Sequence, residues 1–153
     1  MKTKQTAEKV EMVIPALGAP FEGGFFAGEF VLNEERYALV VASKAEGENL
    51  NLPWKKGIKF CQTLNIGGFD DWYLPSRDEL AMLQRNLGPR RQDTPELFRE
   101  GAAEDFETDW YWSSTEHASS SYLAWIVFFS YGYQNYYHKL STNGVRAVRR
   151  LKI

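Results

Sequence analysis

Residues 67–80 read GGFDDWYLPSRDEL, and this stretch decides how the middle of the chain folds. Two adjacent glycines interrupt the helical pattern that precedes them, and residues 70–75 follow as a short extended segment. Ser76, with Glu79 three positions later, has the pattern of a capping box, which predicts the start of a helix. Leucines at helical spacing continue this helix until Gly88-Pro89 ends it.

Upstream, the sequence predicts a buried strand followed by a helix. Residues 37–42 read YALVVA, an apolar, β-branched run between charged flanks, which is typical of a buried strand. Residues 46–51 are predicted to form a polar loop. A helix is expected over residues 53–65, because proline suits its first turn and apolar residues recur at helical spacing. Residues 13–26 mix proline, glycine and aromatic residues, so we expect a loop-rich entry with short strands.

Downstream, the sequence predicts an antiparallel meander. Residues 89–109 lack a strong period and are interpreted as a variable insertion with one helical turn near residues 95–99. Within the apolar run at 122–130, Trp125 and Phe129 are assigned to the core. The expected elements of the last third are strands at 110–113 and 122–130, a turn at Tyr131-Gly132, a return strand at 133–140, a two-residue hairpin at Asn143-Gly144 and a third strand at 145–151.

Length and composition describe one globular domain of 153 residues, 44% hydrophobic and 25% charged. We expect a tail or short segment at residues 1–12 and a single domain at residues 13–153. A net charge of −2 gives no general nucleic-acid footprint. No apolar run is long enough for membrane insertion, and residues 1–11 lack the apolar centre of an export signal. The chain is therefore expected to be cytoplasmic on synthesis, with later association with a virion left open.

Four motifs, in order, resemble the DUF1566 family, also called the Lcl C-terminal domain. They are the stretch at 67–80, YWSSTE at 111–116, the residues Ala124-Trp125 with the FSYG run at 129–132, and VRAVR at 145–149. The similarity covers about residues 13–153, and IPALG at 14–18 resembles phage and prophage members. Tyr73 departs from the family pattern, which usually has arginine there, so the arginine's buried ion pair is not expected.

The resemblance implies an α+β, C-type lectin-like fold, in which two helices flank a mostly antiparallel twisted sheet with a C-terminal strand meander. That fold is shared with formylglycine-generating enzymes and with variable proteins of diversity-generating retroelements. Family members with assigned roles are mostly adhesins and binding modules. The resemblance therefore implies a non-enzymatic ligand- or receptor-binding module, phage- or prophage-encoded, tail-associated or adhesin-like, or a retroelement variable protein. The alternatives are a diverged formylglycine-generating-type enzyme and a structural or assembly subunit with an aromatic oligomer interface.

The residues themselves offer no catalytic constellation. Formylglycine-generating enzymes use reactive cysteines, whereas the single cysteine, Cys61, lies on the apolar face of the predicted helix and is interpreted as a small buried hydrophobe. His117 and His138 belong to no nucleophile motif. We therefore predict no catalytic residue and expect no cofactor.

Charged residues are interpreted mainly as structural. The carboxylate pairs Asp70-Asp71 and Asp78-Glu79 lack the loop pattern of a calcium site, so Ca²⁺ is kept only as a weaker alternative. Asp71 is expected to anchor the bend before Trp72. Arg146 is interpreted as an ion-pair partner, with Glu116 as the candidate. Alternation along a strand keeps the C-terminal arginines from forming one patch.

The predicted site is a tyrosine-rich surface near the C-terminus. Eight of the 16 residues from 122 to 137 are aromatic, and tyrosine beside serine and asparagine is typical of binding surfaces. Alternation places Tyr133, Asn135 and Tyr137 on one strand face, which we expect to be exposed together with Tyr131. The alternative is that these tyrosines merely cover the sheet edge. The predicted ligand-binding residues are Ser120, Tyr131, Tyr133, Asn135, Tyr137 and His138. Expected partners are a protein or glycan on a cell surface, with a homo-oligomer as an open alternative and no specific nucleic acid.

Overall fold

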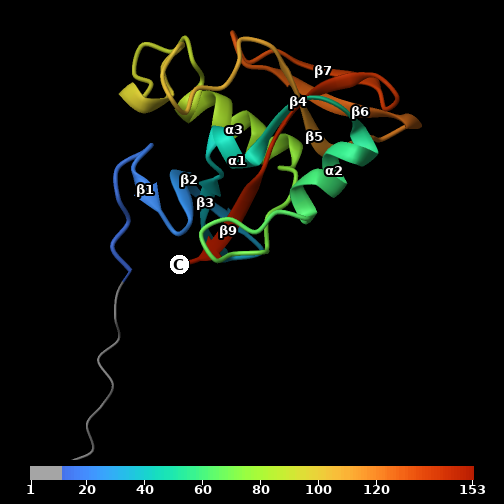
Figure 1. Cartoon of the computed structure of the whole chain (residues 1–153). Coiled ribbons are helices and arrows are strands. Elements are labelled where there is room, and N and C mark those ends of the chain that lie inside the picture. Colours follow the sequence, from blue (N-terminus) through green and yellow to red (C-terminus); the bar gives the residue numbers. More distant parts are fainter. Residues whose placement is uncertain (1–11) are drawn as a thin grey trace, which may run out of the picture.

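Two sheets organise the part of the chain described by the computed structural model, residues 12–153 (Figure 1). The predicted tail at residues 1–12 lies outside the described residues except for Met12. The first sheet has the order β1-β2-β3-β9, with β1 (Pro20–Phe21), β2 (Gly24–Leu32), β3 (Glu35–Val41) and β9 (Val148–Lys152). The second has the order β4-β8-β5-β6-β7, with β4 (Glu48–Pro53), β8 (Thr142–Arg146), β5 (Trp110–His117), β6 (Ser120–Phe128) and β7 (Gln134–His138).

The helices are short and few in the described residues: α1 (Lys44–Gly47), α2 (Trp54–Gln62) and α3 (Arg77–Leu87), with a 3₁₀ turn η1 (Glu96–Phe98). Apart from one parallel pairing between β5 and β8, the strands pair antiparallel. The expectation of an α+β fold with a mostly antiparallel sheet is therefore confirmed. In Figure 1 the second sheet lies above the first, and the red strand β9 runs down from one to the other.

The capping box that the sequence predicts is present at the start of α3. The Ser76 hydroxyl accepts a hydrogen bond from the Glu79 backbone N–H, and the Glu79 carboxylate accepts one from the Ser76 N–H. Tyr73, the departure from the family pattern, donates its hydroxyl to the other Glu79 carboxylate oxygen at 2.5 Å. At the position where the family pattern has an arginine, this chain therefore has a hydrogen bond from the Tyr73 phenol to the Glu79 carboxylate. The predicted first helix is also confirmed, with Pro53 as its N-cap.

The polar loop predicted at residues 46–51 is wrong, because this segment forms the end of α1 and most of β4. Its register runs from Glu48 opposite Arg146 to Pro53 opposite Thr142, with an irregularity between Asn49 and Leu52. β4 is an edge strand that exposes Leu50 and Asn51 in its middle, while its backbone pairs with β8. Such a strand lacks the apolar run by which a buried strand is recognised.

The hairpin predicted at Asn143-Gly144 is also wrong, because both residues lie inside β8. Gly144 stands opposite Tyr111, and a Cβ there would meet the Tyr111 ring at 3.1 Å. The glycine therefore permits a close approach of two strands instead of a turn. The predicted third strand at 145–151 is split at Ala147, and its second half joins the first sheet as β9. The C-terminal meander consists of β5, β6 and β7.

The core has two adjoining clusters. One packs α3 against both sheets and includes Leu39, Leu83 and Val127; the other gathers around α2 and includes Trp54, Trp72 and Trp112. The helical turn predicted near residues 95–99 is confirmed as η1. The surrounding segment also supplies the fully buried Phe98 and Phe106, so it forms part of the core.

Candidate functional site

Four aromatic side chains form a continuous surface row at the end of the β5–β6–β7 meander. We call Trp110, Phe128, Tyr131 and Tyr133 the aromatic row. Trp110 and Phe128 are cross-strand neighbours whose rings stack at 5.0 Å between centroids. Phe128 lies 6.1 Å from Tyr131 and 6.4 Å from Tyr133, and the two tyrosine rings are 5.9 Å apart. These spacings lie within the range of favourable aromatic contacts, so the row holds its own shape.

The tyrosines that the sequence places at the surface are exposed. Tyr131 and Tyr133 each keep 63% of their area accessible, and Tyr137 keeps 50%. Every residue of β7 is exposed, including Asn135. The aromatic row is therefore a water-facing feature with Asn135 and Tyr137 further along the same face of β7.

The structure does not bring all six predicted residues together. His138 follows Tyr137 on β7 and therefore points to the opposite face; its ring stacks on Tyr122 at 6.3 Å. Ser120 lies at the start of β6, where it pairs with His117, and its hydroxyl accepts the Tyr122 N–H. Tyr131 and Tyr133 are in direct contact, whereas Ser120 and His138 lie apart from the row.

Sequence reasoning missed two members of the row and misplaced one residue. Trp110 and Phe128 are partly buried ring neighbours, and only the β5–β6 register shows that they meet. Phe129 is fully buried as predicted, but Trp125 is only partly buried, so its assignment to the core is wrong. The Arg77 guanidinium lies 3.4 Å from the Trp125 ring centroid and shields that ring from solvent.

The turn before β7 is anchored to α3. Gly132 has a φ of +84°, and a Cβ at this position would lie 2.7 Å from the Gln84 side-chain oxygen. Gln84 in turn donates to the Phe129 carbonyl, while the Arg91 guanidinium donates to the Gln84 side-chain oxygen at 2.6 Å. Tyr131 and Tyr133 therefore flank a glycine turn held from behind by polar contacts.

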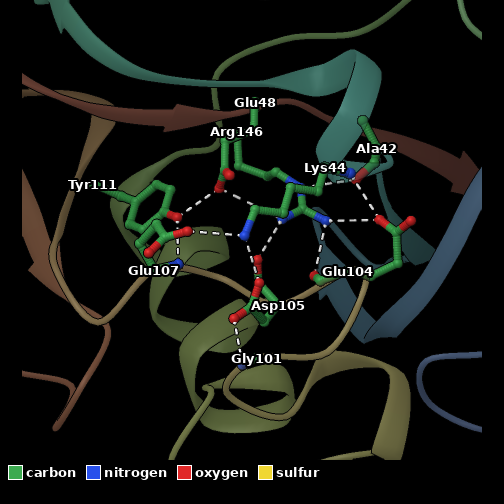
Figure 2. Close-up of polar contacts among 9 residues, drawn as sticks. All are labelled: Ala42, Lys44, Glu48, Gly101, Glu104, Asp105, Glu107, Tyr111 and Arg146. Atoms are coloured by element: carbon green, nitrogen blue, oxygen red, sulfur yellow. Dashed lines mark hydrogen bonds and ion pairs between the residues drawn. The ribbon is translucent and has the colours of Figure 1, made fainter.

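Figure 2 shows a charged network around the buried Arg146 that includes Tyr111, the neighbour of Trp110 on β5. Arg146 on β8 is fully buried and donates to the Ala42 and Glu104 carbonyls at 2.9 and 3.1 Å. Its nearest carboxylates are those of Glu104 at 3.4 Å and Glu48 at 3.5 Å. The predicted partner Glu116 is wrong, because Glu116 pairs with Lys139 at the far end of β5. Burial raises the pKa of Glu48, and the Arg146 charge and the Tyr111 hydroxyl only partly oppose this.

Tyr111 and Lys44 connect this network to residues 104–107. The Tyr111 hydroxyl donates to Glu48 at 2.5 Å and accepts the Glu107 N–H at 2.8 Å. The Lys44 ammonium donates to Asp105 at 2.5 Å and to Glu107 at 2.8 Å (Figure 2). Burial alone would lower the Lys44 pKa, but these two carboxylates together raise it. Tyr111 precedes Trp112 and follows Trp110, so the network fixes the strand that carries the start of the aromatic row.

Two of the candidate calcium carboxylates already have protein partners. Arg149 binds Asp71 through two hydrogen bonds at 2.6 and 3.1 Å, which is the anchoring role predicted for Asp71. Glu79 is occupied by Ser76 and Tyr73. Among residues 12–153, no three His, Cys, Asp or Glu side chains gather in a way that could hold a metal ion.

The cysteine and the two histidines considered for catalysis lie on three different elements, α2, β5 and β7. Cys61 is fully buried, as predicted, and burial raises the pKa of its thiol to about 12. The Nδ1 atoms of His117 and His138 accept backbone N–H groups from Ser119 and Leu140 at 3.2 Å. No helix in the described part of the chain is long and apolar enough to cross a membrane.

A groove of about 550 Å³ lies elsewhere, between the end of β2 and α3. Its wall mixes exposed apolar residues such as Val31 with charged residues such as Glu29 and Arg85. Glu79, a buried acid in its lining, is bound to Ser76 and Tyr73. Phe30 is the one aromatic residue that lines this groove, whereas the row has four aromatic rings and is the better candidate for recognition.

A protein-family model described as the Lcl C-terminal domain matches residues 32–149. The match runs from the end of β2 to the second residue of β9 and includes the whole aromatic row. No curated protein matches the chain.

Proposed function

The chain belongs to the Lcl C-terminal domain family, and on this premise we propose that it is a non-enzymatic module that binds a ligand or receptor through its aromatic row. One observation carries the proposal: Tyr131 and Tyr133 are both 63% exposed although they contact each other and flank an anchored turn. Exposed aromatic clusters on rigid turns are favourable for binding, because little side-chain entropy is lost when a partner covers them.

The β6–β7 part of the row is neutral, whereas Arg90 beside Tyr131 and Asp109 beside Trp110 place charges at its margin. No Asp, Glu, Lys or Arg occurs between residues 117 and 138, while serine, asparagine and glutamine lie among the tyrosines. Aromatic rings supply apolar area, and the amide and hydroxyl groups supply adaptable hydrogen bonds. We infer that the partner is a region of a protein or glycan on a cell surface that offers apolar area and hydrogen-bonding groups.

The finer assignment is that this module is phage- or prophage-encoded and acts at a tail or on a cell surface, after synthesis in the cytoplasm. Its support is the resemblance of residues 14–18 to phage and prophage members of the family. A diversified variable protein of a retroelement also fits, since the tyrosine-rich residues lie on the C-terminal strands. Non-enzymatic action is supported by the inert environment of Cys61, whose thiol is buried with a raised pKa.

Binding to glycans and purified bacterial envelope fractions, with and without Ca²⁺, tests this proposal. We expect Tyr133→Ala to weaken the Kd for the best ligand by about tenfold or more, as truncation of a central aromatic residue does at other interfaces. Tyr122→Ala is the matched control, because Tyr122 is 71% exposed but lies at the opposite end of β6. Equal affinity of the wild type and Tyr133→Ala would contradict the proposed site.

A further inference from the structure

β7 is an unprotected sheet edge. It pairs only with β6, its five residues QNYYH are all exposed, and its register from Leu123↔His138 to Val127↔Gln134 has no bulge. It contains no proline and no charged residue. Proteins commonly protect a sheet edge with a bulge, a proline or a charged residue, because an open edge pairs with another strand.

The other three edges of the two sheets are protected. β1 has only two residues and begins with Pro20. β9 carries Arg150 and Lys152, and its outer side is bridged by Tyr73. β4 has an irregular register and ends at Pro53. β7 is therefore the exception among the edges that the described residues form.

The backbone groups available on β7 follow from its pairing with β6. The Tyr133 carbonyl accepts the Phe128 N–H at 2.8 Å, and the Lys139 N–H donates to the Tyr122 carbonyl at 2.9 Å. Antiparallel pairing alternates, so the backbones of Gln134, Tyr136 and His138 point away from β6. The Tyr136 N–H is bonded to the neighbouring Asn135 side chain at 2.8 Å. A carbonyl from an added strand could replace that side-chain oxygen.

We propose that β7 pairs with β7 of a second copy of this chain, in an antiparallel, two-fold arrangement centred on Tyr136. Gln134 then stands opposite His138 of the second copy, and the two Tyr136 residues exchange backbone hydrogen bonds. In a two-fold interface, a residue at the axis lies beside the same residue of the second copy, so a charged residue there would face a like charge. The charge-free stretch between residues 117 and 138 satisfies this condition.

This pairing leaves the aromatic row accessible, because side chains stand perpendicular to the sheet. Residues directly opposite in an antiparallel pair share a face, so the rows of both copies lie on the same face of the joined sheet. Asn135 lies beside Tyr137 of the second copy. The dimer would present two rows to one partner surface, but the pairing itself does not depend on the proposed ligand-binding role.

Sedimentation velocity of the full chain over a range of concentrations tests the pairing. We expect a concentration-dependent dimer for the wild type, and a dimer dissociation constant at least about tenfold higher for Tyr136→Lys and for Tyr136→Glu alone, since each places like charges across the axis. An equimolar mixture of the two variants should restore the dimer, because the charges are then opposite. Recovery on mixing requires both variants to be folded, so misfolding cannot produce it.

Val31→Lys, at an exposed position of β2 in the other sheet, adds the same charge away from this edge and serves as the control. A wild type that stays monomeric at every concentration would overturn the proposal. It would equally fail if both single variants dimerised like the wild type, or if their mixture did not recover. Because Tyr136 is outside the aromatic row, none of these outcomes decides the ligand-binding proposal.

Discussion

Arg146 lies fully buried where β8 approaches the end of β3, and its guanidinium reaches the Ala42 carbonyl and the carboxylates of Glu48 and Glu104. Replacing it by methionine removes the counter-charge of Glu48, whose side chain is only 3% exposed. Loss of one partner from a buried ion pair typically costs about 3–5 kcal/mol. We expect Arg146→Met to lower the free energy of unfolding by that amount, measured by urea denaturation.

Glu48→Gln provides the matched test of this explanation. If Arg146→Met destabilises the protein because it leaves the Glu48 charge unpaired, the double variant Arg146→Met/Glu48→Gln is less destabilised than the sum of the two single variants. The expected difference is about 1–3 kcal/mol. Strict additivity would mean that Arg146 acts through packing against Phe106 and its hydrogen bonds to backbone carbonyls.

Asp71 gives a pH-dependent prediction at the same scale. The hydrogen bonds from Arg149 hold the pKa of Asp71 below its ordinary value of 3.8. Because the folded carboxyl binds its proton less tightly than the unfolded one, its stabilisation is complete above pH 3.8 and is lost as the pH falls through the lowered value. The Asp71 side chain is 52% exposed, so the contribution is only about 1 kcal/mol.

The comparison is between the wild type and Asp71→Asn, unfolded with urea at several pH values. We expect the difference in the free energy of unfolding to be constant near neutral pH and to close in acid below pH 3.8. A difference that widened in acid would contradict the assigned ion pair.

At the scale of elements, the capping box sets the start of α3. Ser76→Ala removes the hydroxyl that accepts the Glu79 N–H at 3.2 Å. The expected loss is about 1 kcal/mol in the free energy of unfolding. Ser119→Ala, an exposed serine outside any cap, is the control and should change stability by less than about 0.5 kcal/mol. Equal effects of the two substitutions would show that the cap does not stabilise the helix.

The elements predicted from sequence are those specified by local signals. Ser76 and Glu79 are three residues apart, so the start of α3 is visible in the sequence. β4 is different, because its polar residues become a strand only through pairing with β8, almost a hundred residues later. The Asn143-Gly144 pair matches a hairpin signal, yet Tyr111 from a distant strand determines why glycine stands there. Contacts of this kind depend on the complete fold.

The residues of the candidate site also divide into those that local sequence signals reveal and those that depend on the complete fold. Alternation and composition indicate that Tyr131 and Tyr133 reach the surface, and both do. Trp110 enters the row only because the β5–β6 register sets it opposite Phe128. The apolar run at 122–130 predicts Trp125 in the core, but Arg77 from the start of α3 covers it at the surface. Long-range register therefore accounts for the part of the site that composition does not reveal.

At the scale of the whole molecule, the chain crosses from one sheet to the other after β3 and again after β8, and the backbones at these two crossings are hydrogen-bonded to each other. The Ala42 N–H donates to the Ala147 carbonyl at 3.0 Å, and the Ala147 N–H donates to the Gly47 carbonyl at 2.9 Å. One hydrophobic cluster contains Leu39 and Val148 from the first sheet and Val127 from the second. The two sheets therefore share a core, and neither can lose its packing alone.

This shared core predicts a single cooperative unfolding transition. Tryptophan fluorescence reports mainly on the second sheet, because three of the five tryptophans, Trp110, Trp112 and Trp125, lie on its strands β5 and β6. Far-UV circular dichroism reports on both sheets, so the two urea curves should coincide. Native-state amide exchange gives a sharper comparison, because Val40 lies in β3 and Ile126 in β6. We expect both amides to open with the free energy of global unfolding. If Val40 exchanged through a lower-energy opening while Ile126 stayed protected, the first sheet would unfold independently, and the contacts at Ala147 would not couple the sheets.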